Sequence, residues 1–182
     1  MPELHAGLAK NNTVPNVAGG ILWADDVNKV FWLYGGEYDN VPSAFELWGY
    51  DTILNQWNMS TAPEQATSTI QRVSYGAGTT LDRLGFYYGG YLNQRTNPRW
   101  NGPPIATTGL IRFDMNNSRL DNMTGPDNIG RAEGVMLSVP ASAAGLLVYF
   151  GGVTFPYGNT TEVPMPMSNI MIYDSKFHLH TQ

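Results

Sequence analysis

Three Gly-Gly doublets constrain the fold of this chain more than any other feature. They are Gly35-Gly36, Gly89-Gly90 and Gly151-Gly152, and each ends an apolar, aromatic-rich run. They lie 54 and 62 residues apart. An aromatic–aspartate pair follows each of them: Tyr50-Asp51, Phe113-Asp114 and Tyr173-Asp174. Recurrence at about 50 residues is typical of folds that repeat one supersecondary unit, so the sequence predicts three copies of such a unit.

Each copy is expected to hold four β-strands, because its runs of β-branched and aromatic residues are short and bounded by glycine. The first strands are expected at 17–23, 73–79 and 132–138, and the second strands end at the doublets. Loops follow at 37–44, 91–108 and 153–167. The third strand ends at the aromatic–aspartate pair, and the fourth surrounds Trp57, Leu120 or Phe177. We place a lead-in at 1–15 and the copies at 16–62, 71–124 and 130–182.

Composition supports an all-β fold class. Charged residues make up only 14% of the chain and aromatic residues 12%, with 20 Gly and 12 Pro, whereas an average protein is about 25% charged. This profile suits short strands and tight turns rather than helices or disorder. The net charge of −5 and the lack of basic clusters argue against nucleic-acid binding. The sequence has no apolar run long enough to predict a membrane span.

The repeated residues have physical roles in such a unit. Glycine permits a positive φ and a close approach of two backbones. The strand that ends at a doublet needs both where it meets the crowded centre of the fold. The aspartate can accept hydrogen bonds from turn amides, and its aromatic neighbour is expected between sheets. A single four-stranded sheet cannot bury both of its apolar faces, but radial stacking of such sheets in a β-propeller can. Closed propellers have about 4 to 8 blades, so three copies predict an open arc that further blades or self-association would close.

The doublet, the aromatic–aspartate pair 15 to 24 residues later and an aromatic residue about six further on resemble the kelch repeat. The first copy, with Trp57, matches best; Leu120 takes this place in the second copy, and Phe177 or Leu179 in the third. The resemblance covers roughly residues 16–180 and implies a kelch-type β-propeller with about three four-stranded antiparallel blades. The Asn-, Ser- and Thr-rich loops are most similar to kelch modules of fungal secreted or membrane-anchored proteins, some of them labelled after the central domain of galactose oxidase.

The kelch resemblance also implies that the long loops share one face and bind a protein or a glycan. Loops on a rigid scaffold often carry function, and Arg and Trp are enriched in binding hot spots. The candidate binding residues are Tyr38, Asp39, Tyr91, Asn93, Arg95, Arg99, Trp100 and Tyr157. For Trp100 the alternative is that its side chain folds back to pack its own loop.

Catalytic chemistry has little support in the sequence. The chain has no cysteine, which excludes disulfides and thiolate catalysis, and the common hydrolase, phosphate-loop and zinc-protease motifs are absent. His178 and His180 alternate on a predicted strand, a spacing that can suit zinc or copper. A third ligand is not apparent, so we predict no metal, no cofactor and no enzymatic activity. Two alternatives stay open: a fragment of a carbohydrate-active or copper-dependent oxidase-like propeller with its active site elsewhere, and an intracellular kelch adaptor.

Glycosylation sequons bear on the compartment. Five occur, at Asn11, Asn58, Asn116, Asn122 and Asn159. A secreted or cell-surface chain would explain them, and so would turns that are rich in Asn, Ser and Thr. Residues 1–15 show no basic and apolar leader, so an extracellular location requires a leader outside this sequence. We predict an extracellular or cell-surface location.

Two expectations concern other charged residues. Asp25-Asp26 is expected in a solvated turn. Arg72 and Arg131 are expected at equivalent positions of the second and third copies, paired with an aspartate such as Asp51 or Asp114.

Overall fold

A computed structural model describes residues 10, 12–39, 46–60, 70–158, 161–174 and 180–181 of the chain. All of the regular secondary structure in these residues consists of β-strands, which confirms the all-β fold class. The same residues contain no helix long and apolar enough to cross a membrane. Asn11, Asn159, Phe177, His178 and Leu179 lie outside the described residues, and only the backbone of His180 is described.

Three four-stranded antiparallel sheets dominate the fold, and in each of them the strands pair in chain order. The first sheet consists of β1 (Val17–Asp25), β2 (Val30–Tyr38), β3 (Leu47–Asp51) and β4 (Gln56–Ser60). The second consists of β5 (Ala77–Leu81), β6 (Leu84–Tyr88), β9 (Leu110–Asp114) and β10 (Arg119–Met123). The third consists of β12 (Val135–Val139), β13 (Leu146–Phe150), β16 (Ile170–Asp174) and β17 (His180–Thr181).

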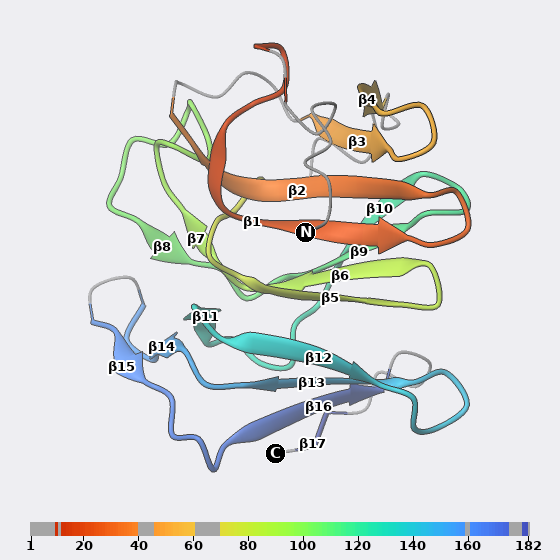
Figure 1. Cartoon of the computed structure of the whole chain (residues 1–182). Coiled ribbons are helices and arrows are strands. Elements are labelled where there is room, and N and C mark those ends of the chain that lie inside the picture. The colour runs from red at the N-terminus through yellow and green to blue at the C-terminus, as the bar shows by residue number, and fades with distance from the viewer. Residues whose placement is uncertain are drawn as a thin grey trace, which may run out of the picture.

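The sheets are stacked as a fan (Figure 1). Their first strands β1, β5 and β12, which we call the inner strands, lie side by side. The later strands of the first and third sheets run away from them in opposite directions. Within the described residues the fan does not close into a ring. We call the face that a sheet turns toward the following sheet its forward face, and the opposite face its rear face.

Aromatic side chains fill the space between the first two sheets. The buried ring of Trp23 on the forward face of the first sheet stacks on Tyr34, 4.9 Å between centroids, and on Phe113 of the second sheet, 5.7 Å away. The Trp23 indole N–H also donates to the Phe86 carbonyl at 3.1 Å. Phe113 belongs to an aromatic–aspartate pair, so this pair places a ring between sheets, as predicted.

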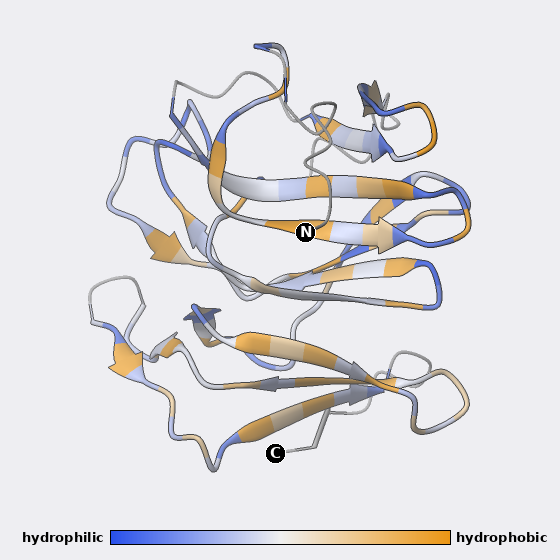
Figure 2. Ribbon diagram, viewed as in Figure 1, coloured by the Kyte–Doolittle hydropathy of each residue, from blue (hydrophilic) through white to orange (hydrophobic). Residues whose placement is uncertain are grey.

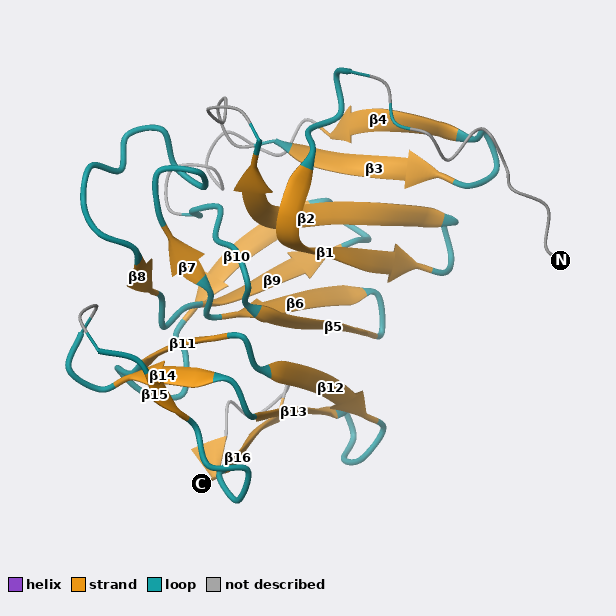
Figure 3. Ribbon diagram, turned by 60° about the vertical axis from the view of Figure 1, so that its left-hand side comes forward, coloured by secondary structure: helices purple, strands orange, loops and turns teal. Residues whose placement is uncertain are grey.

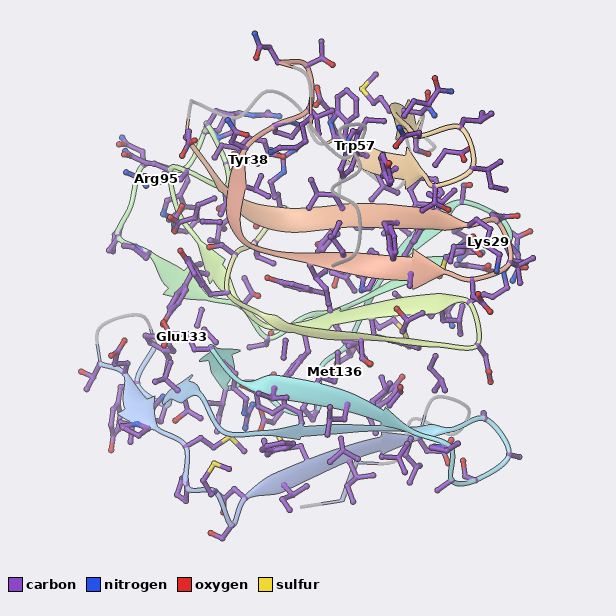
Figure 4. The ribbon with its side chains drawn as sticks, in the orientation of Figure 1. Lys29, Tyr38, Trp57, Arg95, Glu133 and Met136 are labelled. Carbon is purple, nitrogen blue, oxygen red and sulfur yellow. The ribbon has the colours of Figure 1, made fainter. Side chains whose placement is uncertain are left out.

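A second apolar cluster joins the second and third sheets. Tyr88 meets Tyr149 edge to face at a centroid distance of 5.1 Å. Met136 (Figure 4) and Leu147 of the third sheet are buried in the same cluster. The middle sheet is therefore covered on both faces, as expected for apolar strands that bury their area against neighbours.

The Gly-Gly doublets connect neighbouring sheets. Gly35 and Gly89 have φ of 71° and 68°, and a Cβ on them would lie 2.6 Å from the Val73 carbonyl oxygen and 2.3 Å from the Arg131 carbonyl oxygen. The N–H groups of Gly36 and Gly90 donate to those same carbonyls, at 2.9 and 2.7 Å. We call this contact the doublet joint. The backbone of the following sheet leaves no room for a side chain there. The crowding predicted at the doublets therefore comes from the next sheet.

A second backbone contact repeats beside the doublet joint. Gly19, Tyr75 and Glu133 all have a positive φ, at 70°, 55° and 61°. Tyr75 N–H donates to the Gly19 carbonyl at 2.8 Å, and Glu133 N–H donates to the Tyr75 carbonyl at 2.7 Å. These residues hold equivalent places in the three sheets, so one chain of hydrogen bonds crosses the starts of the inner strands.

The segments after the doublets were expected to be loops, but they carry short strands. Tyr91–Leu92 (β7) pairs with Ile105–Ala106 (β8), and Gly130–Ala132 (β11), Val153–Phe155 (β14) and Val163–Pro164 (β15) form a small sheet. The ladder resumes beyond each doublet, since Tyr91 bridges to Ser74 and Val153 pairs with Ala132. All of these strands gather at one end of the fan, which we call the loop face (Figure 3).

The aspartates of the first two copies cap hairpin turns, as predicted. Asp51 accepts hydrogen bonds from the N–H groups of Ile53 and Leu54 at 2.8 and 2.9 Å, and Asp114 accepts one from Asn116 N–H at 2.9 Å. Asx turns of this kind are typical of tight connections.

Arg131 pairs with an aspartate, as predicted, but its partner is neither Asp51 nor Asp114. Arg131 pairs with Asp127 at 2.6 Å, and the Arg72 guanidinium lies 3.9 Å from the centroid of the Tyr38 ring. The doublet joint also shows that Arg131 corresponds to Val73, not to Arg72. Asp51 and Asp114 hold the turns of their own hairpins instead.

Asp25 is buried, which corrects the expectation of a solvated turn. Its carboxylate accepts hydrogen bonds from the N–H groups of Val27 and Asn28, at 3.2 and 3.1 Å, and contacts Arg83 of the second sheet at 3.4 Å. Asp26 is exposed and pairs with Lys29 at the turn end of the fan, opposite the loop face (Figure 4). The β1–β2 turn packs against the next sheet, and this packing buries the first aspartate only.

Substitution of the doublet glycines should show which sheets are joined. Gly89→Ala forces a Cβ against the Arg131 carbonyl, whereas the nearest atom to a Cβ on Gly151 is the Met167 sulfur at 3.4 Å. Both variants carry the left-handed backbone cost of about 1–2 kcal/mol, and only Gly89→Ala also breaks a doublet joint. In urea unfolding we expect the larger loss of stability for Gly89→Ala; equal losses would contradict the joint.

The buried Asp25 should make stability depend on pH in acid. Burial opposes its ionisation, but hydrogen bonds from Asn28 and Arg83 outweigh burial and lower the pKa of Asp25 below its usual value. A lowered folded-state pKa stabilises the fold above the unfolded pKa, about 3.9, and this stability is lost as pH falls through the folded pKa. Asp25→Asn should therefore cost about 1–2 kcal/mol at neutral pH. The difference from wild type in urea unfolding should shrink below pH 4; a difference that is constant with pH would contradict this role.

Candidate binding cleft on the loop face

A cleft of about 560 Å³ opens on the loop face. Its lining combines aromatic rings with carboxylates. The rings are those of Tyr75, Tyr91 and Phe155, and the carboxylates are those of Glu37, Glu133 and Glu162. Sites of this size accommodate a small ligand or a few side chains of a partner.

The contacts between sheets determine which residues line the cleft. Glu37 and Tyr91 directly follow the first two doublets, and Tyr75 and Glu133 are the positive-φ residues of the hydrogen-bond chain. Glu37 and Tyr91 therefore share one place in the repeat, and Tyr75 and Glu133 share another. The cleft lies where these places converge, at the start of the inner strands, and Glu133 is visible there in Figure 4.

Tyr91 connects the rings to the carboxylates. Its hydroxyl donates to Glu133 Oε1 at 3.3 Å, and its ring meets Tyr75 and Phe155 edge to face at centroid distances of 6.4 and 5.8 Å. Burial, followed by the charges of Glu133 and Glu162, raises the pKa of Tyr91 well above its usual value. Its phenol is therefore a neutral hydrogen-bond donor at physiological pH.

Asn93 fixes the other wall of the cleft. Its side-chain amide donates to Glu37 at 2.6 Å, and its side-chain oxygen accepts from the N–H groups of Arg95 and Thr96 at 2.8 and 3.1 Å. Arg95 lies 3.9 Å from Glu37 and partly balances its charge. Among the described residues no Lys or Arg forms an ion pair with Glu133 or Glu162. The side of the cleft that contains Glu133 and Glu162 therefore carries the excess negative charge.

Of the eight candidate binding residues, the structure brings Tyr91 and Asn93 into the cleft. Arg95 is exposed and contacts Glu37 of the cleft wall, and Arg99 is exposed elsewhere on the same loop. Trp100 is half-buried against the first core cluster, and its indole N–H donates to the Pro103 carbonyl at 2.9 Å. Trp100 thus packs its own loop, which was the alternative for this residue.

The remaining three candidates do not line the cleft. Tyr38 is buried beneath the Arg72 guanidinium, and burial raises the pKa of Tyr38 to about 12. The exposed Asp39 donates its backbone N–H to the Asn16 carbonyl at 3.4 Å. The Tyr157 side chain is exposed in the turn after β14.

Sequence reasoning missed Glu37, Tyr75, Glu133, Phe155 and Glu162. The sequence did contain a signal for Tyr75 and Glu133. A glycine follows the positive-φ residue near the start of each inner strand, at Gly20, Gly76 and Gly134. Aligning these glycines as well as the doublets would have placed Tyr75 and Glu133 beside Glu37 and Tyr91.

The described sequon asparagines lie away from the cleft. Asn58 is on β4, Asn116 is in the β9–β10 turn and Asn122 is on β10; all three are exposed. β4 and β10 are the last strands of their sheets, so two of these sequons lie on sheet edges. The described residues contain no group of three His, Asp or Glu side chains that could hold a metal ion.

No protein-family model matches the chain, and a comparison with curated proteins finds no match. The resemblance to kelch repeats therefore rests on the chain's own residues alone.

Proposed function

We propose that this chain is a non-enzymatic interaction module, built as three blades of a kelch-type β-propeller, that binds a protein partner through its loop face. Four-stranded sheets whose strands pair in chain order, with neighbouring first strands, support the propeller architecture. The doublet joint supports it further, because the residues that resemble the kelch repeat make the contact between successive sheets.

One observation carries the binding proposal: three rings and three carboxylates share one cleft, and Glu133 and Glu162 have no basic partner among the described residues. A Lys or Arg side chain is attracted both to aromatic faces and to carboxylates. The net charge of −5 favours approach of a basic segment over long range. We therefore propose a basic segment of a protein as the ligand, in preference to a glycan, which would need the rings but not the charges.

The proposed location is extracellular or at a cell surface. The exposed positions of Asn58, Asn116 and Asn122 support it, because a sequon must be accessible to be modified. Mass spectrometry of the chain secreted from a eukaryotic host should find glycans on these asparagines. Secreted protein that is unmodified at all three would count against the location.

Charge substitutions in the cleft test the binding proposal. Titration calorimetry would use an Arg- and Lys-rich peptide as the probe against Glu133→Gln, Glu162→Gln and Asp26→Asn. The control changes the net charge equally but lies at the opposite end of the fan. We expect each cleft variant to weaken binding about five-fold, near 1 kcal/mol, with little effect of the control.

Two outcomes would contradict this proposal. Equal weakening by Asp26→Asn would show that only the net charge attracts the peptide. If a neutral oligosaccharide bound the wild type, and both cleft variants bound it equally well, the glycan alternative would replace the basic segment.

A further inference from the structure

The forward face of the third sheet is apolar and exposed. Neighbouring residues form the rows Val135–Phe150–Ile170 and Leu137–Val148–Ile172 across β12, β13 and β16. Leu137 is 50% exposed, and Val135 and Ile170 are nearly as open. Orange bands mark these strands in Figure 2. Large exposed apolar patches generally mark an interaction surface.

The same face is buried in the two preceding sheets. Trp23 of β1 and Ala77 of β5 point from the forward faces of the first and second sheets, and both are buried. The pairing registers place Leu137 of β12 at the position of Trp23. The third sheet thus presents the surface that the other two sheets use to bind their successors.

The backbone shows the same unfinished contact. Gly36 and Gly90 donate their N–H groups to the following sheet, but among the described residues no carbonyl of a following sheet meets the N–H of Gly152. A Cβ on Gly151 would meet only the Met167 sulfur within 4 Å, whereas Gly35 and Gly89 abut backbone carbonyls. Gly151 and Gly152 keep their positive φ, of 70° and 75°, and are therefore shaped for a doublet joint.

The rear face of the first sheet offers the matching half. Leu22 is 55% exposed there, and Phe31 on β2 and Met59 on β4 are exposed on the same face. Phe31 holds the place that Gly85 has in the second sheet, where Trp23 of the first sheet packs against it. Leu137 would thus meet Phe31 where Trp23 meets Gly85. The smaller Leu137 leaves room for the larger Phe31. Val17 holds the place of Val73 and Arg131, whose carbonyls accept the doublet N–H.

We infer that two copies of this chain associate head to tail, with the third sheet of each packed on the first sheet of the other. The first and third sheets run from the inner strands in opposite directions (Figure 1), so one fan resembles half of a ring. Two fans give six sheets, which lies within the range of closed propellers, about 4 to 8 blades, with two-fold symmetry. This inference rests on the propeller architecture of the proposed function and not on its ligand.

The experiment is analytical ultracentrifugation of the full chain over a range of concentrations. The wild type should sediment with twice the mass of one chain. Leu137→Glu and Leu22→Glu should each sediment as monomers, because each places a charge in both copies of the interface. Ile53→Glu is the control, since Ile53 is 73% exposed in a hairpin turn outside both faces; it should stay dimeric.

Mixing the two interface variants identifies the arrangement. In a head-to-tail pair one interface of the mixed dimer combines two unaltered faces, so the mixture should regain dimers that neither variant forms alone. Circular dichroism and thermal unfolding should confirm that both variants fold, and Leu137→Ala and Leu22→Ala should shift dimers toward monomers if the glutamates unfold the chain.

A wild type that stays monomeric at its highest soluble concentration would overturn the inference. Dimers that survive Leu22→Glu but not Leu137→Glu would also overturn it, because they would show that two third sheets pack together. Concentration-dependent growth beyond two chains would indicate an open filament in place of a closed ring. Peptide binding by the monomeric Leu137→Glu variant is measured separately, so loss of the dimer and loss of the cleft ligand remain distinguishable.

Discussion

The fold depends on a backbone hydrogen bond between successive sheets. In each doublet joint, a glycine without a Cβ lets the next sheet approach, and the following N–H reaches the carbonyl of Val73 or Arg131. Hydrogen bonds between backbones impose a fixed distance and direction, whereas apolar packing alone tolerates sliding. The aromatic clusters around Trp23 and Tyr88 supply most of the buried area, and the joints determine how the sheets are placed relative to one another.

The same contacts explain where the candidate cleft lies. A residue with positive φ lies near the start of each inner strand, and a residue just beyond each doublet continues the ladder, so both places converge on the loop face. Side chains at these places are free to differ between copies, because the hydrogen bonds use only backbone atoms. This explains why the equivalent place holds Gly19 in the first sheet, Tyr75 in the second and Glu133 in the third while the backbone hydrogen bonds stay the same.

The sequence predicted the framework better than the site. The doublets and aromatic–aspartate pairs have strict steric or hydrogen-bonding requirements, and therefore they recur visibly; Phe113 and Asp51 lie where those requirements predicted. The side chains in the cleft do not recur in this way: only the glycine after Glu133 repeats, and no repeated residue marks Phe155. Asp25 was misjudged for a related reason: its burial depends on the neighbouring Arg83, which no local pattern indicates. The compartment and the ligand remain proposals, because they concern contacts outside the chain.

The stacking order has a consequence for how the molecule opens. In the part of the chain that the structure describes, the four-stranded sheets pack chiefly against their neighbours in sequence. Stability is therefore expected to behave as a sum of sheet and interface terms along one dimension. The middle sheet has two interfaces, and each outer sheet has one. In an isolated chain, amide hydrogens of β6 and β9 should therefore exchange with solvent more slowly than those of β3 or β16, which can detach without disturbing the rest. A closed ring of two chains would give every sheet two neighbours and remove this gradient.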